Sequence, residues 1–362
     1  HNLEQYQKTG FNDVVSSSIF YRRDFVYPPS KRCWRARSGV NLVTVDKRLK
    51  VGVIGAGYLG SIHARIYGRM KDVDLVGIAD INRKAGEQVA KECDCEYFDD
   101  ARFMLDRVDA VSIVVPTSAH REVAEPFLNA RIPVLVEKPI AHTLVDAQRV
   151  VELAAATGTL LQIGHLERFN AGVVRLYQEL DRPRFIEVHR LGEFVERATD
   201  VDVVTDLMIH DIDIVLSLVP SELRYISAVG AKVVTEHVDI ANARLEFEDG
   251  AIANVTASRI SAKKFRRIRI FAEACYLGLN FENQQIDIAR PGPKPTPGAF
   301  APIVTDSIQV TPRPPLDAEL EDFVECVRSG RAPVVGGEEG LRALRVAHEV
   351  RQRIDESLHT LD

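Results

Sequence analysis

The feature that most constrains the fold is an alternation of short apolar runs with helix-length segments, starting near Leu49. Continuous apolar runs are typical of strands that are buried on both faces, and a helix between successive runs makes a βαβ unit. We therefore predict an α/β fold whose first part is a doubly wound parallel sheet. The runs are residues 51–54, 75–79, 110–115, 134–136 and 160–163, and the helical segments are 62–70, 83–92, 119–129 and 145–157.

The pattern changes after about residue 169, where longer strand-like segments replace the alternation. Glu248-Asp249-Gly250 between two of them is a hairpin signal, so we predict a second, α+β domain with a large open, mostly antiparallel sheet. The expected strands are 185–191, 223–233, 241–247, 251–258 and 266–274, the expected helices are 203–218, 317–329 and 338–358, and residues 291–302 are a Pro- and Gly-rich loop. The predicted division is an irregular extension at 1–47, a first domain at 48–169 and a second at 170–362.

Composition excludes several classes of protein. With 362 residues, 46% of them hydrophobic, the chain is long enough for two buried cores. The net charge of −6 is spread along the chain, which argues against a nucleic-acid partner. No apolar run approaches the roughly 18 residues of a membrane span, and the start lacks a signal-peptide block, so we expect a cytoplasmic protein. Five scattered cysteines indicate reduced thiols, and Cys93-Asp94-Cys95 alone does not predict a metal site.

A glycine-rich loop follows the first predicted strand and precedes the first predicted helix. Glycines at such a G-x-G-x-x-G turn let the backbone approach a pyrophosphate, which then meets the helix N-terminus. Asp80 ends the second strand, 20 residues after Gly60, where a carboxylate binds ribose hydroxyls and repels a 2′-phosphate; this favours NAD. Arg83 could pair with that phosphate, which leaves NADP as the less favoured cofactor. The loop residues are Gly55, Gly57, Tyr58, Leu59 and Gly60.

Lys138 lies in Glu137-Lys138-Pro139, directly after a buried strand, at the sheet edge where open α/β sheets bind ligands. An ammonium there could stabilise a developing alkoxide, although a lysine at a strand end is often simply solvated. Asp206 and His210 are four residues apart and would share one face of a helix. The histidine could accept a proton, or the pair could be a helix-terminal acid and a surface histidine.

Gly55–Gly60, Glu137–Pro139 and Asp206–His210, in this order and at this separation, resemble the Gfo/Idh/MocA oxidoreductase family over about residues 49–358. The resemblance implies an N-terminal Rossmann domain, a C-terminal domain whose open sheet contacts substrate and other subunits, and oxidation of a sugar or polyol. It implies that Lys138, Asp206 and His210 are catalytic, with His210 the acid/base, and that the protein is a homodimer or homotetramer.

Segments 162–170, 206–213 and 337–344 are similar to one subgroup, the bacterial UDP-N-acetylglucosamine 3-dehydrogenases and related UDP-sugar 3-dehydrogenases; Ala171 stands where that subgroup has proline. This similarity implies NAD-dependent oxidation of a sugar 3-hydroxyl, followed by an aminotransferase in amino-sugar lipid A synthesis. The alternatives are a UDP-N-acetylglucosaminuronate 3-dehydrogenase, an inositol-type polyol dehydrogenase, and a nucleotide-binding sensor without catalysis.

Further candidate residues flank these motifs. A guanidinium grips phosphate and an amide can bind sugar groups, although Arg168 could equally brace the domain interface. Thr117 could lie near the nicotinamide half of the cofactor or cap the next helix. The candidate substrate residues are Lys138, His165, Arg168, Asn170, Asp206 and His210, and the further cofactor candidates are Pro116, Thr117, His120, Glu137 and Lys138.

Overall fold

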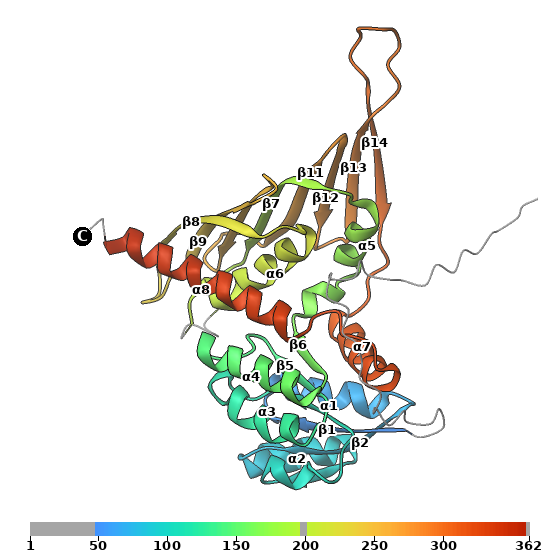
Figure 1. Cartoon of the computed structure of the whole chain (residues 1–362), viewed down its shortest axis with the longest axis vertical. Coiled ribbons are helices and arrows are strands. Elements are labelled where there is room, and N and C mark those ends of the chain that lie inside the picture. Colours follow the sequence, from blue (N-terminus) through green and yellow to red (C-terminus); the bar gives the residue numbers. More distant parts are fainter. Residues whose placement is uncertain (1–47, 196–200, 360–362) are drawn as a thin grey trace, which may run out of the picture. The chain divides into compact units, whose positions relative to one another are not determined.

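A computed structural model describes residues 48–195 and 201–359 of the chain. The predicted extension at 1–47 lies outside the described residues. The first sheet is parallel, with the strand order β3-β2-β1-β4-β5-β6 (Figure 1). This order is the doubly wound arrangement that binds dinucleotides. Its strands are β1 (Leu49–Ile54), β2 (Val73–Ala79), β3 (Glu96–Phe98), β4 (Ala110–Ile113), β5 (Val134–Glu137) and β6 (Leu161–Gly164).

Helical segments connect these strands, as the alternating pattern predicts. They are α1 (Tyr58–Arg69), α2 (Arg83–Cys93), η1 (Ala101–Met104), η2 (Thr117–Ala119), α3 (His120–Asn129) and α4 (Leu144–Thr157), where η1 and η2 are 3₁₀ turns. Strand β3 was not predicted, because three residues at a sheet edge are too few to show a periodic pattern.

The second sheet has the strand order β14-β13-β12-β11-β7-β10-β9-β8 and is antiparallel except for the β7–β10 pair. This confirms the expected large, mostly antiparallel sheet. Its strands are β7 (Pro183–Leu191), β8 (Leu223–Ala231), β9 (Ile240–Phe247), β10 (Ile252–Ser258), β11 (Phe265–Ala272), β12 (Cys275–Asn280), β13 (Gln285–Pro291) and β14 (Ile303–Gln309). The accompanying helical segments are η3 (Leu166–Phe169), α5 (Ala171–Glu179), η4 (Val204–Met208), α6 (Ile209–Leu218), α7 (Pro315–Ser329) and α8 (Gly337–His359).

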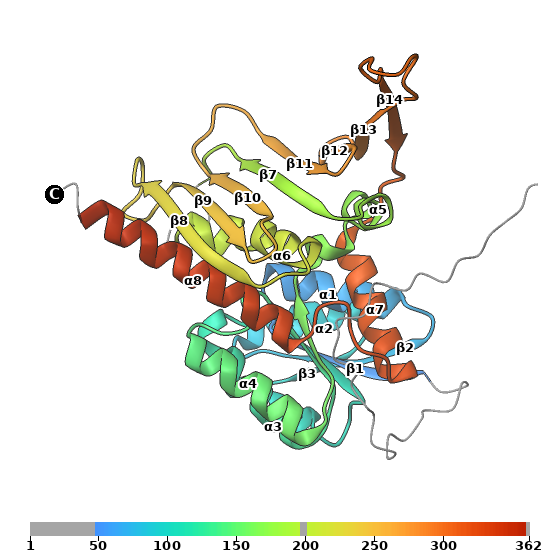
Figure 2. The ribbon, with the colours of Figure 1, turned by 45° about the horizontal axis from the view of Figure 1, so that its top comes forward.

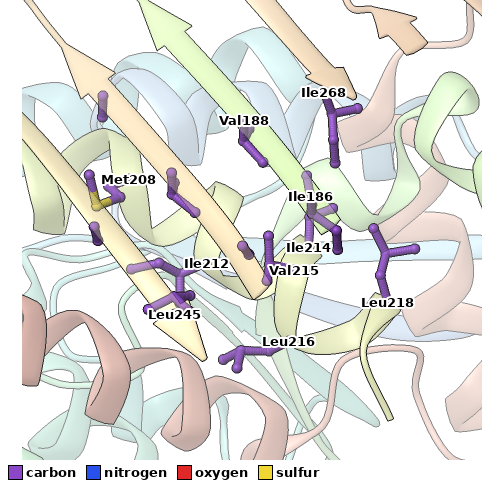
Figure 3. Close-up of a cluster of buried hydrophobic side chains, with 14 of the residues drawn as sticks. Ile186, Val188, Met208, Ile212, Ile214, Val215, Leu216, Leu218, Leu245 and Ile268 are labelled. Carbon is purple, nitrogen blue, oxygen red and sulfur yellow. The ribbon is translucent and has the colours of Figure 1, made fainter. Parts of the chain in front are cut away.

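Helices α6 and α8 cover one face of the second sheet (Figures 1 and 2). Figure 3 shows the core between them: Val215 of α6 lies near Ile186 of β7, and Ile212 of α6 lies beside Leu245 of β9. These side chains are at most 1% exposed, and burying each contributes roughly 1.5–3 kcal/mol. The opposite face of the sheet carries exposed side chains such as Tyr225.

Helix α7 belongs by sequence to the predicted second domain but packs against the first sheet. Its Leu320, Phe323 and Val324 share a buried cluster with Leu49 of β1 and Tyr67 of α1. The domain boundary at residue 170 remains a prediction. After the second sheet, the chain returns through α7 to complete the core of the first domain. No helix in the described part of the chain combines the length and apolarity that a membrane crossing requires.

Candidate active site

The glycine loop has the geometry of a phosphate cradle. Gly55 has φ +108°, and a Cβ there would lie 2.3 Å from the main-chain oxygen of Val114. A Cβ on Gly60 would lie 1.9 Å from the main-chain oxygen of Gly55, so the turn closes only with glycine at both positions. A Cβ on Gly57 would meet nothing within 4 Å, and Gly57 precedes α1 without a side-chain cap. The open helix end fits a pyrophosphate.

The next two loop positions lie in the first turn of α1. Tyr58 is 78% exposed, whereas Leu59 is half-buried. Neither side chain closes the open end of the helix at Gly57, so backbone N–H groups remain the main binding groups of this loop.

Asp80 stands beside this loop, as the sequence predicts. Its Oδ2 accepts from Ala56 N and its Oδ1 accepts from Asn82 N, both at 2.6 Å. The half-buried carboxylate is thus fixed between the glycine loop and the end of β2, where it fits ribose hydroxyls.

Arg83 is occupied by other partners. Its Nη1 lies 3.1 Å from Glu87 Oε1, its Nη2 lies 3.8 Å from Asp99 Oδ2, and its guanidinium stacks over the Tyr97 ring. The side chain is 67% exposed, so these ion pairs are weak and hold it only loosely.

Lys138 follows β5 and reaches the second sheet's helices. Its Nζ donates to the main-chain oxygen of Asp206 at 2.8 Å and lies 3.9 Å from Asp206 Oδ1. Burial lowers the pKa of Lys138, while the carboxylates of Asp206 and Glu137 oppose this shift. The side chain is 18% exposed, so a ligand can reach the ammonium.

Asp206 lies in a π-helical turn, η4, and His210 is the second residue of α6. The predicted helix over 203–218 exists, but it is not regular: a π turn opens it, and such turns often occur at functional sites. Asp202 holds the turn by accepting from Val204 N and Thr205 N through Oδ1, both at 3.0 Å. In this geometry Asp206 contacts Lys138, so the structure ties the acid to the lysine.

His210 is half-buried beside Lys138 and has the properties of a proton acceptor. Its Nδ1 has no hydrogen-bond partner among the described residues. Burial, followed by the positive charges of Lys138 and Arg190, holds the pKa of His210 well below its ordinary value. The imidazole is therefore neutral near pH 7 and ready to accept a proton.

The three candidates that follow β6 are nearly buried and have structural surroundings. His165 is 1% exposed, and its ring stands edge-on to that of His210 with centroids 6.5 Å apart. Arg168 Nη1 lies 3.4 Å from Asp213 Oδ1, and Asn170 Oδ1 accepts from Gly172 N at 3.0 Å, capping α5. These contacts favour the bracing role for Arg168, and a substrate role for any of the three stays a prediction.

The cofactor candidates that follow β4 are Pro116, Thr117 and His120. Thr117 begins the 3₁₀ turn η2, and the N-cap of α3 is Ala119, without a side-chain hydrogen bond. The alternative that Thr117 caps the next helix is therefore wrong, because the short turn intervenes. His120 is 1% exposed, and its ring nitrogens lie 2.9 Å from the main-chain oxygens of Pro139 and Val115. It joins the end of β4 to the peptide after Lys138, whereas Pro116 precedes the turn.

Sequence reasoning missed a buried ion cluster behind His210. Arg190 of β7 donates to both oxygens of Asp211 at 2.7 Å, and its Nη1 lies 3.2 Å from Glu167 Oε1. Arg266 also pairs with Glu167. The alternation of buried and more exposed residues along β7 places Arg190 on the covered face of the sheet, where a charge needs a partner. A charged residue at an inward-facing strand position was therefore the sequence signal for this ion cluster.

No group of three or more His, Cys, Asp or Glu side chains within 48–195 and 201–359 is arranged to hold a metal ion.

Comparisons with known proteins match both halves of the chain. A family model described as "Oxidoreductase family, NAD-binding Rossmann fold" matches residues 49–165, and the "GFO/IDH/MocA C-terminal domain" matches 162–277. The UDP-N-acetylglucosamine 3-dehydrogenase of Acidithiobacillus ferrooxidans is 36% identical over 308 residues, covering 85% of this chain and 97% of that protein. The scyllo-inositol 2-dehydrogenase (NAD(+)) of Bacillus subtilis is 27% identical and covers 80% and 90%.

Solved structures agree with these matches. A structure of UDP-N-acetylglucosamine 3-dehydrogenase GnnA from Acidithiobacillus ferrooxidans has a TM-score of 0.80 at 35% identity, covering 85% of this chain and 98% of that one. Scyllo-inositol dehydrogenase from Lactobacillus casei, with bound NAD(H) and scyllo-inositol, has a TM-score of 0.71 at 21% identity, covers 86% and 98%, and shows the fold alone.

Proposed function

Because the chain belongs to the Gfo/Idh/MocA family of nicotinamide-dependent oxidoreductases, we propose that it oxidises the sugar 3-hydroxyl of UDP-N-acetylglucosamine to the 3-keto sugar. The proposal is supported by 36% identity over nearly the whole length of a UDP-N-acetylglucosamine 3-dehydrogenase. The inositol dehydrogenases are more distant relatives, at 27% identity.

The observation that carries the chemistry is a neutral histidine beside a partly accessible ammonium. Oxidation of a secondary alcohol needs a base for the hydroxyl proton and a positive group for the developing oxyanion. Lys138, from the first sheet, and His210, from α6, supply these two groups, and the charge of Lys138 helps to keep His210 neutral. A non-catalytic sensor would need the glycine loop but neither of them.

Each residue then has a distinct role. His210 takes the proton of the 3-hydroxyl, and Lys138 stabilises the negative charge that develops on that oxygen. Asp206 positions Lys138 through its main-chain oxygen and its carboxylate. A bound nicotinamide supplies the hydride acceptor.

We propose NAD as the preferred cofactor. Asp80 is fixed beside the glycine loop, where its negative charge would repel a 2′-phosphate. Arg83 would have to leave Glu87 and Asp99 to receive that phosphate.

The cations around the site favour a neutral sugar over a uronate. Arg190 is held by Asp211 and Glu167, and Arg168 pairs with Asp213, so both charges are already balanced. Arg197, a further cation near these in sequence, lies outside the described residues. The product, a 3-keto sugar, is a substrate for transamination, so an aminotransferase is the expected next enzyme. We also propose a homodimer or homotetramer formed through the exposed sheet face that carries Tyr225 and Phe271.

The test is the appearance of reduced nicotinamide when purified protein meets NAD or NADP. The substrate panel is UDP-N-acetylglucosamine, its uronate, UDP-glucose and myo-inositol, and an aminotransferase with glutamate removes product. We expect NADH with UDP-N-acetylglucosamine only. Turnover of another sugar alone would replace the substrate, and no turnover despite demonstrated NAD binding would contradict the enzyme assignment.

A further inference from the structure

A line of buried polar side chains runs through the first core to the residue before Lys138. His63 of α1 is fully buried; its Nδ1 lies 2.8 Å from Ser112 Oγ on β4, and its Nε2 lies 3.2 Å from Glu137 Oε1 at the end of β5. Glu137 is directly followed by Lys138. The helix is thereby connected to the candidate catalytic lysine through one carboxylate.

Glu137 has little freedom to move. Its Oε2 accepts from Lys138 N at 3.2 Å, and the same carboxylate lies close to Gly164. A Cβ on Gly164 would lie 2.7 Å from that oxygen, so only glycine leaves room for the carboxylate. A buried carboxylate needs nearby partners for its charge, and the partners here are His63 and Lys138.

We propose that His63 is a positioning residue: it holds the Glu137 carboxylate beside Lys138, and this carboxylate keeps the lysine ammonium charged. A carboxylate only accepts hydrogen bonds, so the His63 proton that faces Glu137 is placed on Nε2, and the Ser112 hydroxyl then donates to Nδ1. Ser112 thus selects the histidine tautomer. The inference deepens the proposed function, because it assumes the role given there to Lys138.

The surrounding charges are consistent with this arrangement. Burial lowers the pKa of Lys138, Asp206 and Glu137 counteract it, and Arg190 lowers it further. Burial, followed by the charges of Lys138 and Arg190, lowers the pKa of His210 as well. Removing the carboxylate of Asp206 or of Glu137 should therefore lower the pKa of Lys138 further, because less negative charge opposes the effect of burial.

Glu319 of α7 is the other acid near Glu137. It is fully buried, and neither carboxylate oxygen has a hydrogen-bond partner among the described residues. Burial, together with the negative charge of Glu137, raises the pKa of Glu319 well above its usual range. This shift favours the protonated form of Glu319. Tyr67 of α1 and the buried His120 and His165 are further titratable neighbours of Glu137, and Asp322 and Asp213 also act on Glu319.

The test measures the titration of Lys138 directly, in the full chain without substrate. Competitive labelling with acetic anhydride over a pH series, read by mass spectrometry, gives the apparent pKa of Lys138. For Glu137→Gln we expect this pKa to fall by about one unit, a roughly tenfold rise in labelling at a fixed pH below it, because an opposite charge has been removed. His63→Gln should shift it in the same direction, and adding His63→Gln to Glu137→Gln should change nothing further.

Thr159→Val is the control, since it removes a buried hydroxyl of the first domain that contacts Thr157 and the main-chain oxygen of Leu128 instead of Glu137; it should leave the Lys138 titration unchanged. If thermal unfolding shows that His63→Gln does not fold, Ser112→Ala is the second variant, because it removes the hydroxyl that contacts His63 Nδ1 and leaves the imidazole in place. An unchanged Lys138 pKa in the folded His63 or Ser112 variant overturns the proposal.

Kinetics separate this inference from the proposed function. In an active enzyme, His63→Gln should lower kcat and move its alkaline limb to lower pH, with the KM for NAD nearly unchanged. A purely structural histidine would lower stability without moving that limb. If the wild type turns over no sugar while the labelling shift is still present, the proposed function is wrong and the His63–Glu137–Lys138 linkage stands.

Discussion

Two glycines of the same loop should respond to alanine in opposite ways. The Cβ of Gly60→Ala would lie 1.9 Å from the main-chain oxygen of Gly55, more than 1 Å closer than side chains tolerate. The obstacle is backbone, so strand β1 and helix α1 must separate. Such overpacking costs roughly 1–3 kcal/mol or more, which lowers Tm by several degrees.

Gly57→Ala has no such obstacle. Its φ of −67° is ordinary for alanine, and its Cβ would meet nothing within 4 Å. The folded protein should be as stable as the wild type, or more stable by about 0.4–1 kcal/mol because the unfolded chain loses freedom. The methyl group would, however, occupy the space into which a pyrophosphate fits. We expect NAD to bind roughly 10- to 100-fold more weakly, about 1.4–2.8 kcal/mol.

Thermal unfolding and calorimetric titration with NAD distinguish the two effects. Gly57→Ala should keep its Tm and lose affinity, whereas Gly60→Ala should lose Tm in the absence of cofactor. Normal NAD affinity in Gly57→Ala would refute the phosphate-cradle interpretation of this loop. A wild-type Tm in Gly60→Ala would refute the close backbone approach at the strand–helix turn.

Other predictions concern the site and its charges. Lys138→Met and His210→Asn should each reduce kcat by about 100-fold or more. The acid limb of the kcat–pH profile should lie below about pH 6.5, because His210 must be neutral and burial lowers its pKa. The alkaline limb should lie below about pH 10.4, because Lys138 must be charged and burial lowers its pKa. Limbs at or above these pH values would contradict the burial argument. Glu319 binds a proton on folding, so stability should fall as pH rises above about 4.3, and Glu319→Gln should remove this loss and raise Tm at pH 7; an equal or lower Tm would show that the carboxylate is ionised and paired. Asp80→Asn should reduce the preference for NAD over NADP in steady-state kinetics by roughly tenfold, and an unchanged ratio would place discrimination elsewhere.

Much of the first domain was predictable because its signals are local. The apolar runs reproduce β1, β2, β4, β5 and β6, and the glycine spacing places the loop at the start of α1. In the second domain, helix α5 and strands β12 to β14 were not predicted. β14 is exposed almost throughout, so it has no apolar face by which to recognise it.

The local sequence therefore determined the doubly wound sheet, the glycine loop with Asp80 beside it, and the position of Lys138 at a strand end, since periodicity and glycine content act within a few residues. Only the tertiary structure decided what the charged side chains do. Asp206 faces Lys138 because a π turn interrupts the helix, and Asp211 meets Arg190, 21 residues away, because α6 packs on β7. His63 reaches Glu137 across a still longer stretch of sequence, because α1 packs on the first sheet. A buried charge takes the partner that packing brings within a few ångströms, and sequence spacing does not encode that distance.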